Sequence, residues 1–191
     1  ALVEPSAVAM RAVRRSRLQE GERTVVLGVG TVGMMAMQEA RALGAQVFAV
    51  DRRQMSLDLA TQLGAHAVIN PETQDAGEAL RDLTDGDGPD VIIDAAGGRD
   101  TPALAARWVR PGGRVLLVAL FTGRTEIDFN SVVGREVEVI GSIAYQQRDI
   151  EQVVSMISSG AIRTSPLISA RISLEDVLSK GYERMMAPTK D

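Results

Sequence analysis

Short apolar runs alternate with stretches of helical periodicity along this chain. The apolar runs have the length of β-strands and stand at 24–29, 46–50, 67–69, 90–96, 114–120 and 137–143. Around them, apolar residues recur every three or four positions, which predicts helices over 5–17, 34–43, 54–63, 76–84, 101–109, 148–158 and 174–186. The segment 121–130 carries neither pattern and is predicted to be an irregular connection.

The order of these elements predicts a parallel sheet. The run Val91-Ile92-Ile93 is continuously apolar, which indicates a strand that is covered on both faces. Strands that alternate with helices form parallel sheets, because each helix returns the chain to the edge where the last strand began. Right-handed crossovers then favour a doubly wound α/β sheet of six strands in the order 3-2-1-4-5-6. We also predict that Thr101 is the N-cap of the helix over 101–109, with Pro102 at its first position.

A glycine-rich turn joins the first strand to the next helix. The strand ends in Gly28-Val29-Gly30-Thr31-Val32-Gly33, the G-x-G-x-x-G pattern of a dinucleotide-binding turn. We interpret Gly28 as the tight turn, Gly30 as the point where the backbone approaches the phosphates, and Gly33 as the contact between helix and strand. The first-turn amides near Thr31 and Val32 are predicted to point unpaired N–H groups at the anion.

An acidic residue follows the second strand. Asp51 stands 18 residues after Gly33, close to where such folds place the carboxylate that binds the adenosine ribose. The alternative is a phosphate-free α/β turn in which Asp51 is an ordinary strand-end residue. Because a carboxylate repels a 2′-phosphate, Asp51 favours NAD over NADP as the cofactor. Arg52, a further candidate cofactor contact, and Arg53 leave alternatives open, since an arginine there can meet a phosphate, stack on the adenine or point to solvent.

Composition narrows the range of partners. The 191 residues carry a net charge of −4 and few aromatic residues (one Trp, two Tyr and three Phe). This balance offers no general attraction to nucleic acid or to an anionic membrane, and no base-stacking surface. The sequence holds no apolar run of about 18 residues and no signal-peptide pattern, so a cytoplasmic location is the default expectation. Without cysteine, the chain forms neither disulfides nor thiolate metal sites.

The ionisable residues of the first helix and the single histidine are predicted to have no catalytic role. The first helix carries Arg11, Arg14, Arg15 and Arg17, which indicate either a phosphate or partner site or a solvated helix face. We favour the solvated face. His66 is the only histidine, and because one histidine cannot build a zinc site, we predict a structural role for it.

Together these motifs resemble the cofactor domain of the medium-chain, zinc-type alcohol and polyol dehydrogenases. The resemblance covers nearly the whole chain and is greatest to the sorbitol, threonine and butanediol dehydrogenase branch. It implies hydride transfer between an alcohol carbon of a small-molecule substrate and NAD. The motifs that carry it, by their order and spacing, are Glu4-Pro5, Glu20-Gly21-Glu22, the glycine turn, Leu43-Gly44-Ala45, Asp51, Leu63-Gly64-Ala65, Asp94-Ala95-Ala96-Gly97, Arg110-Pro111-Gly112-Gly113 and Ile140-Gly141-Ser142.

The resemblance also implies a division of the chain. Residues 1–20 would connect from an N-terminal catalytic domain, residues 21–165 would form a Rossmann-type NAD-binding domain, and residues 166–191 would return toward the catalytic domain. The chain begins without methionine and ends soon after a helix, so we expect a fragment that lacks the catalytic domain. The zinc ligands of the family, a Cys and a His-Glu pair, belong to that domain. Zinc is therefore expected in the intact protein, while this chain alone is expected to bind NAD without oxidising an alcohol.

Individual cofactor contacts follow from the same resemblance. Ala95 and Ala96 would border the adenosine side of the cofactor. The backbone at the end of the fifth strand would accept hydrogen bonds from the carboxamide, at Val118, Ala119 and Leu120. Three residues past the sixth strand would flank the nicotinamide ring, namely Ser142, Ile143 and Ala144. Glu4 matches a glutamate at or near the catalytic zinc of the family, and a carboxylate favoured by the dipole of a helix start is the equal alternative.

The strand over 137–143 is predicted to be the edge of the sheet. An unpaired edge invites pairing with another chain, and members of the family often join two sheets there about a two-fold axis. We therefore expect a homodimer through this edge.

Three other functions bear on the same residues. A methyltransferase that binds S-adenosylmethionine usually has G-x-G-x-G, which would need glycine where this chain has Val32. A non-catalytic module that senses NAD stays open, as does a relative of the zinc-free quinone reductases.

Overall fold

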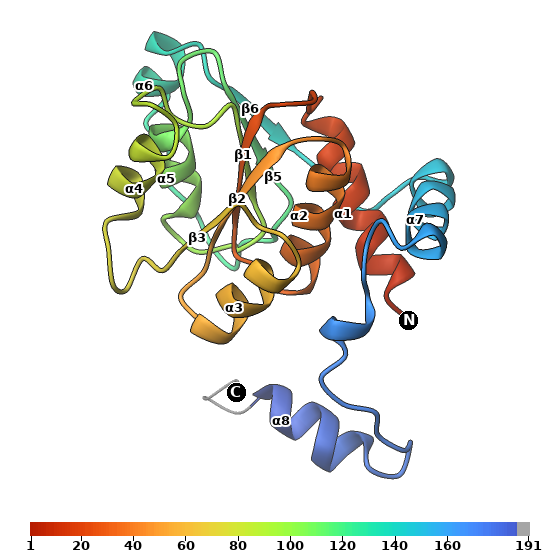
Figure 1. Cartoon of the computed structure of the whole chain (residues 1–191). Helices are drawn as coiled ribbons and strands as arrows, with labels where there is room; N and C mark the ends of the chain where they lie inside the picture. The colour runs from red at the N-terminus through yellow and green to blue at the C-terminus, as the bar shows by residue number, and fades with distance from the viewer. Residues whose placement is uncertain (187–191) are drawn as a thin grey trace.

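A parallel sheet of six strands forms the centre of the structure, a computed structural model in which residues 1–186 are described (Figure 1). The strands are β1 (Arg23–Leu27), β2 (Gln46–Val50), β3 (Ala67–Ile69), β4 (Val91–Asp94), β5 (Arg114–Leu117) and β6 (Glu138–Gly141). They lie in the order β3-β2-β1-β4-β5-β6, and every neighbouring pair is parallel. The predicted doubly wound α/β sheet is therefore confirmed, with its strand order reversing between β1 and β4.

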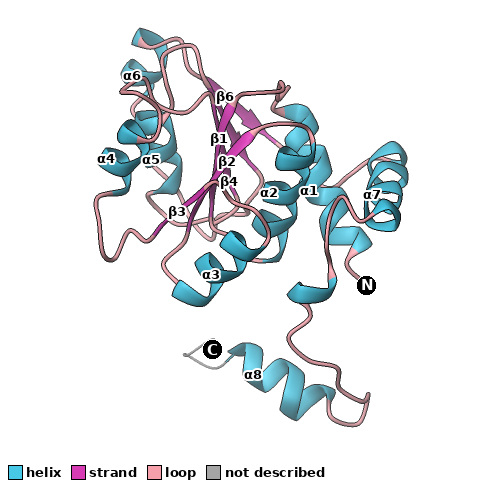
Figure 2. Cartoon of the chain, viewed as in Figure 1, coloured by secondary structure: helices cyan, strands magenta, loops and turns pink. Residues whose placement is uncertain are grey.

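Helices cover both faces of this sheet (Figures 1 and 2). One face carries α1 (Val3–Arg15), α2 (Thr31–Ala42) and α3 (Gln54–Gln62). The opposite face carries α4 (Ala76–Asp82), α5 (Thr101–Trp108) and α6 (Phe129–Gly134). A further helix, α7 (Gln147–Ser159), packs against α1. Within residues 1–186, no helix is long and apolar enough to cross a bilayer.

Successive residues of the central strands enter two separate cores. Val26 of β1 belongs to the core beneath α2 and α3, together with Met35 and Leu57. Its neighbour Val25 belongs to the core on the other face, together with Leu80 of α4. Because strand side chains point alternately to the two faces, a strand between two cores needs an apolar residue at every position. This requirement explains the continuous apolar runs of β1 and β4.

Two helical segments differ from the prediction. The segment 121–130 is not irregular throughout, because α6 begins at Phe129. None of the six residues of α6 is buried, so the helix leaves no apolar periodicity, and the Asp128 carboxylate stabilises its start by accepting from the amide of Asn130. The predicted helix over 174–186 is a π-helix (Val177–Tyr182) followed by α8 (Glu183–Met186). Of the predicted segment 166–191, residues 187–191 lie outside the described part of the chain.

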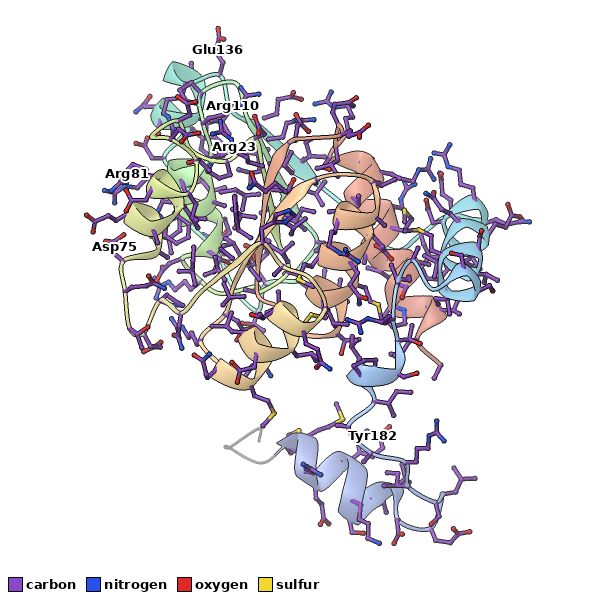
Figure 3. All side chains as sticks on the ribbon, viewed as in Figure 1. Arg23, Asp75, Arg81, Arg110, Glu136 and Tyr182 are labelled. Atoms are coloured by element: carbon purple, nitrogen blue, oxygen red, sulfur yellow. The ribbon has the colours of Figure 1, made fainter. Side chains whose placement is uncertain are left out.

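Arginines tie the segments at the amino edge of the sheet together. Arg23 and Arg110 both bind Asp90, whose Oδ1 lies 2.6 Å from the Arg110 Nε and whose Oδ2 lies 3.7 Å from the Arg23 Nε (Figure 3). Burial acts to raise the pKa of Asp90, but the hydrogen bonds and charges of the two arginines hold it below its ordinary value. Arg114, at the start of β5, is buried and donates to the carbonyl oxygens of Ser16 and Arg17 at 2.8 and 2.9 Å. These bonds hold the end of α1 at the amino edge, so α1 runs from the carboxyl edge toward the amino edge.

The solvated face predicted for the four arginines is present only in part, because Arg15 and Arg17 are exposed while all four also bind other segments. Arg14 forms an ion pair with the fully buried Asp149 of α7. Arg15 donates from Nε to the carbonyl oxygen of Gly141 at 2.8 Å, and Arg17 forms an ion pair with Glu138 of β6. Their partners lie more than 120 residues away in the sequence, which is why helical spacing did not reveal them. With Arg11, which lies 4.0 Å from Asp149, all four arginines therefore join α1 and the turn after it to α7 or to β6.

His66 has the predicted structural role. Its Nδ1 accepts a hydrogen bond from the amide of Val47 at 3.0 Å, and its own amide donates to the Val47 carbonyl oxygen at 2.8 Å. The imidazole therefore holds the start of β3 beside β2.

One buried carboxyl group has no partner among the described residues. Glu39 of α2 is fully buried, and neither of its side-chain oxygens makes a hydrogen bond. Burial raises the pKa of Glu39 well above its ordinary value, and the nearby negative charge of Asp149 raises it further. The folded protein therefore holds Glu39 protonated over a pH range in which the unfolded chain ionises it.

Replacing Glu39 by methionine should make the protein more stable at neutral pH. Because the pKa of Glu39 is raised on folding, its ionisation favours the unfolded chain, and this loss grows as the pH rises above about 4.3. We expect Glu39→Met to raise the free energy of unfolding by about 1–3 kcal/mol at pH 7.5, the usual cost of an unpaired buried polar group. The gain should be smaller at pH 5.

Urea unfolding followed by circular dichroism at the two pH values measures this difference. Glu151→Met, at an exposed position of α7, is the matched control and should give a small effect that does not depend on pH. A gain that is the same at pH 5 and pH 7.5 would show that Glu39 does not titrate on unfolding.

Candidate functional site

The carboxyl edge of the sheet brings together the residues that the sequence singled out. Parallel strands end at the same edge, so the segments that follow them lie beside one another in strand order. Asp51 follows β2, the glycine turn follows β1, and Ala95 and Ala96 follow β4. The segments 118–120 and 142–144 follow β5 and β6. The candidate contacts thus form one row across the edge, with the glycine turn at the point where the strand order reverses.

Two glycines of the turn are required by close backbone contacts. Gly28 has φ +80°, and a Cβ atom there would lie 2.6 Å from the Cα of Ala96. A Cβ atom on Gly33 would lie 1.9 Å from the carbonyl oxygen of Gly28, closer than any side chain can approach. The roles predicted for Gly28 as the tight turn and Gly33 as the contact between helix and strand are therefore confirmed. As a result, α2 begins directly above the end of β1.

The start of α2 presents amides that no side chain of residues 1–186 caps. Gly30 is the N-cap residue, so it supplies no capping side chain, and the first intrahelical bond runs from the Met34 amide to the Gly30 carbonyl oxygen at 2.8 Å. The space beside Gly30 is open, since the nearest atom to a Cβ there would be the Arg53 Nη2 at 3.9 Å. The helix start at Thr31 and Val32 is thus open on the side of Gly30, and the amides of a helix start favour an anionic group.

Asp51 braces the same turn. One oxygen of its carboxylate accepts from the Val29 amide and the other from the Arg53 amide, each at 2.9 Å. Carboxylate oxygens have further lone pairs, so these bonds leave Asp51 able to accept from a sugar hydroxyl. Arg53 also lies 3.4 Å from Asp51 through its Nε, whereas Arg52 is exposed and forms an ion pair with Glu72. Of the two arginines, Arg53 is therefore the one beside the turn.

Asp94 organises the next two segments of the edge, a role that the sequence did not reveal. Its side chain accepts from the amides of Ala96 and Gly97 at 3.0 and 3.2 Å, and from the Thr101 hydroxyl at 2.6 Å. Its carbonyl oxygen accepts from the amides of Val118 and Ala119. Burial raises the pKa of Asp94, and the three side-chain hydrogen bonds oppose this rise. Asp94 thus holds the segments after β4 and β5 together.

The sequence predicted Thr101 as the N-cap of α5, and this prediction is wrong. The cap position belongs to Asp100, and Thr101 is the first helical residue. Its hydroxyl instead donates to the Asp94 carboxylate across the loop. The signal that could have revealed it is a carboxylate at a strand end, seven residues before a hydroxyl.

A hollow lies at the carboxyl ends of β5 and β6. It measures about 430 Å³ and is lined by Arg11 and Arg15 of α1 and by Leu117, Ala119, Leu120, Gly141, Ser142 and Ile143. Leu120 and Ile143 are largely exposed, and the buried Ser142 hydroxyl oxygen makes no hydrogen bond to the described residues. Ala144 has the left-handed φ of +52°, which is unusual for alanine and turns the chain sharply after β6. Residues from three elements therefore meet around one space.

Glu4 is the candidate metal ligand of this chain. It is exposed, at the second position of α1. Within residues 1–186, no three His, Cys, Asp or Glu side chains lie close enough to hold a metal ion together. The described residues therefore do not fit a zinc ion, which needs three or four protein ligands.

Comparison with known proteins places this geometry in a family. Residues 31–159 match the family described as zinc-binding dehydrogenase. Sorbitol dehydrogenase of Bacillus subtilis is 32% identical over 178 residues, which cover 92% of this chain and 50% of that protein. The solved structure of 2R,3R-butanediol dehydrogenase from Bacillus subtilis superposes with a TM-score of 0.91 at 29% identity and covers all of this chain and 55% of its own.

A third relative is described with a bound cofactor. The structure of a zinc-binding dehydrogenase from Sinorhizobium meliloti bound to NADP superposes with a TM-score of 0.86 at 30% identity, and the match covers 93% of this chain and 54% of that one. The chain thus spans about half the length of these relatives. With the family match over more than half of its residues and the Rossmann-type sheet, the chain belongs to the zinc-binding dehydrogenase family.

Proposed function

We propose that this chain is the nicotinamide-cofactor domain of an NAD-dependent alcohol or polyol dehydrogenase. The observation that carries the proposal is the start of α2, where unsatisfied amides face an open space beside Gly30 and Asp51 braces the turn. Relatives named sorbitol dehydrogenase and butanediol dehydrogenase support the alcohol or polyol as the substrate class. No contact in the structure favours the NAD-sensing module or the quinone reductase over this function.

The cofactor would lie across the carboxyl edge of the sheet. The amides of Thr31, Val32 and Gly33 would bind the diphosphate, and Asp51 would accept hydrogen bonds from the adenosine ribose. The adenosine would lie beside Ala95 and Ala96, with the exposed Arg52 at its outer side. The carbonyl oxygens of 118–120 would bind the carboxamide, and residues 142–144 would flank the nicotinamide ring.

The chemistry is divided between this chain and the part of the protein beyond it. Bound nicotinamide supplies the hydride acceptor or donor for the alcohol carbon. The residues of this chain would hold and orient the cofactor, and within residues 1–186 no group of side chains offers a zinc site. We propose that residues 1–20 and 166–191 connect this domain to a catalytic domain, where Glu4 would lie near the zinc.

Substituting Gly30 tests the proposed diphosphate site. The φ of Gly30 is −70°, and nothing lies within 3.9 Å of a Cβ there, so Gly30→Ala should fold with unchanged thermal stability. The added methyl group would occupy the space through which the diphosphate reaches the amides. We expect NADH to bind the unaltered chain and to bind Gly30→Ala at least tenfold more weakly in isothermal titration calorimetry.

Gly134→Ala is the matched control, because a Cβ there would meet no atom within 4 Å and Gly134 lies on α6, away from the turn. It should leave the affinity for NADH unchanged. An unaltered chain that fails to bind NADH, or a Gly30→Ala variant that binds it equally well, would contradict the proposal.

Asp51 should set the preference for NAD over NADP. A carboxylate about 4 Å from a 2′-phosphate repels it by roughly 1–4 kcal/mol between water and a partly buried site. Asp51→Asn keeps an acceptor for the Val29 amide and removes this charge. We expect the ratio of the NADP and NAD dissociation constants to fall by at least fivefold in the variant, as measured by calorimetry. Equal affinities of the unaltered chain for the two cofactors would refute the assignment to NAD.

We further propose a homodimer formed through β6. β6 has a neighbour on one side only, and Val139 is partly exposed on it. A lysine at this position should oppose strand pairing, so Val139→Lys is expected to shift the mass in light scattering from dimer to monomer. Val154→Lys, at an exposed apolar position of α7, is the control and should leave the dimer intact. A monomeric mass for the unaltered chain at high concentration would exclude the proposed dimer.

A further inference from the structure

Two arginines of α1 face the hollow at the ends of β5 and β6. Arg11 and Arg15 stand one helical turn apart, so their side chains lie on the same face of α1. Both line the hollow, opposite Leu120, Ser142 and Ile143. An anionic group in this space would therefore meet two guanidinium groups at once.

Among residues 1–186, few carboxylates balance the positive charge at this place. Arg11 reaches only one carboxylate among the described residues, Asp149, and does so at 4.0 Å. Asp149 already forms the closer ion pair with Arg14 and accepts from the amide of Gln146 at 2.7 Å. Arg15 uses its Nε for the carbonyl oxygen of Gly141, which carries no net charge. Among the described residues, Arg11 and Arg14 thus share the carboxylate of Asp149, and Arg15 forms no ion pair.

Glu39 of α2 is a second acid close enough to Asp149 to interact with its charge, and it adds no negative charge while it is protonated. Glu39 is buried with a raised pKa, so it is held neutral where an exposed glutamate would ionise. The excess of positive charge is unusual in a chain whose net charge is −4. Arg11 is half-buried and Arg15 is exposed. Arginine side chains bind carboxylates and phosphates through paired N–H groups.

The hollow lies too far from the glycine turn to serve the diphosphate of the cofactor. β1 and β5 are separated by β4, and neighbouring strands are about 4.8 Å apart, so the end of β5 lies about 10 Å from the turn and the end of β6 about 14 Å. The hollow is instead bordered by residues 119–120 and 142–143, the proposed seat of the nicotinamide. A group bound there would lie beside the reacting end of the cofactor, where the substrate must be.

We propose that the substrate of this dehydrogenase is a polyol or sugar that carries a carboxylate or a phosphate ester, and that Arg11 and Arg15 bind this anionic group. The inference rests on the proposed function, because it takes the ends of β5 and β6 as the nicotinamide side of the cofactor. Ser142 lines the same hollow, beside Leu120 and Ile143. Arg11 and Arg15 would thus determine which alcohols are accepted.

Three compounds with the same six-carbon skeleton test this proposal. Sorbitol is neutral, D-gluconate carries a carboxylate, and sorbitol 6-phosphate carries a phosphate ester. Each is titrated into the isotopically labelled chain, with and without NADH, while the amide resonances of residues 141–143 are followed. We expect at least one of the anionic compounds to shift these resonances saturably, with a dissociation constant at least tenfold lower than that of sorbitol. The anion that binds more tightly identifies the substrate as a sugar acid or a sugar phosphate.

The variants separate the two arginines from a general charge effect. Arg11→Gln/Arg15→Gln should weaken binding of the preferred anion at least tenfold and leave sorbitol unaffected. Arg107→Gln removes the same kind of charge from an exposed position of α5, on the opposite face of the sheet, and should weaken it less than twofold. Circular dichroism of each variant verifies that it is folded, and the single substitutions Arg11→Gln and Arg15→Gln replace the double variant if it is not.

Different results would contradict the anion site and the proposed cofactor site. Two results would contradict the assignment of Arg11 and Arg15 and leave the cofactor site intact. In the first, NADH binds but sorbitol and the two anions have the same dissociation constant. In the second, Arg107→Gln weakens binding of the anion as much as the double variant does. If NADH does not bind, the cofactor proposal falls. Anion binding measured without NADH then shows whether the arginine pair is an anion site in its own right.

Discussion

The contact between Gly33 and the carbonyl oxygen of Gly28 is the constraint on which the rest of the site depends. It lets α2 begin directly above the end of β1, and no residue with a Cβ atom can stand at position 33 without separating them. The same turn touches the segment after β4 through Gly28 and Ala96. Helix start, strand end and the neighbouring loop are therefore fixed relative to one another within a few atoms. The amides at the start of α2 point where they do because of this packing.

Two carboxylates, Asp51 and Asp94, stabilise the loops at the carboxyl edge of the sheet. Asp51 accepts from two backbone amides beside the turn, and Asp94 accepts from two amides and a hydroxyl in the next loop. Backbone N–H groups in loops need such acceptors, because no ladder or helix satisfies them. The loops of the candidate site are thus ordered by the protein's own anions. This arrangement also keeps the acceptors of Asp51 close to where a ribose would lie.

Local sequence patterns were enough to predict the strands, their order and the glycine turn. The apolar runs and the glycine turn predict the six strands and their order, because each βαβ unit is contiguous and has one allowed hand. Asp51 was found by its spacing from Gly33. Contacts between distant segments were not found: Arg14 meets Asp149 and Arg114 meets Ser16, and no spacing along the chain encodes either pair. For the same reason the hollow beside α1, which needs three elements to be placed first, could not be predicted.

Asp94 joins the two halves of the carboxyl edge in a way that bears on how a long ligand is received. Its side chain orders the loop after β4, and its carbonyl oxygen orders the chain after β5. One residue thus immobilises both the segment proposed for the adenosine and the segment proposed for the carboxamide. The conformational entropy of these loops is lost when the domain folds, so binding of a dinucleotide does not have to order them. A molecule with two distant ends therefore encounters a single preformed surface rather than two that must be assembled around it.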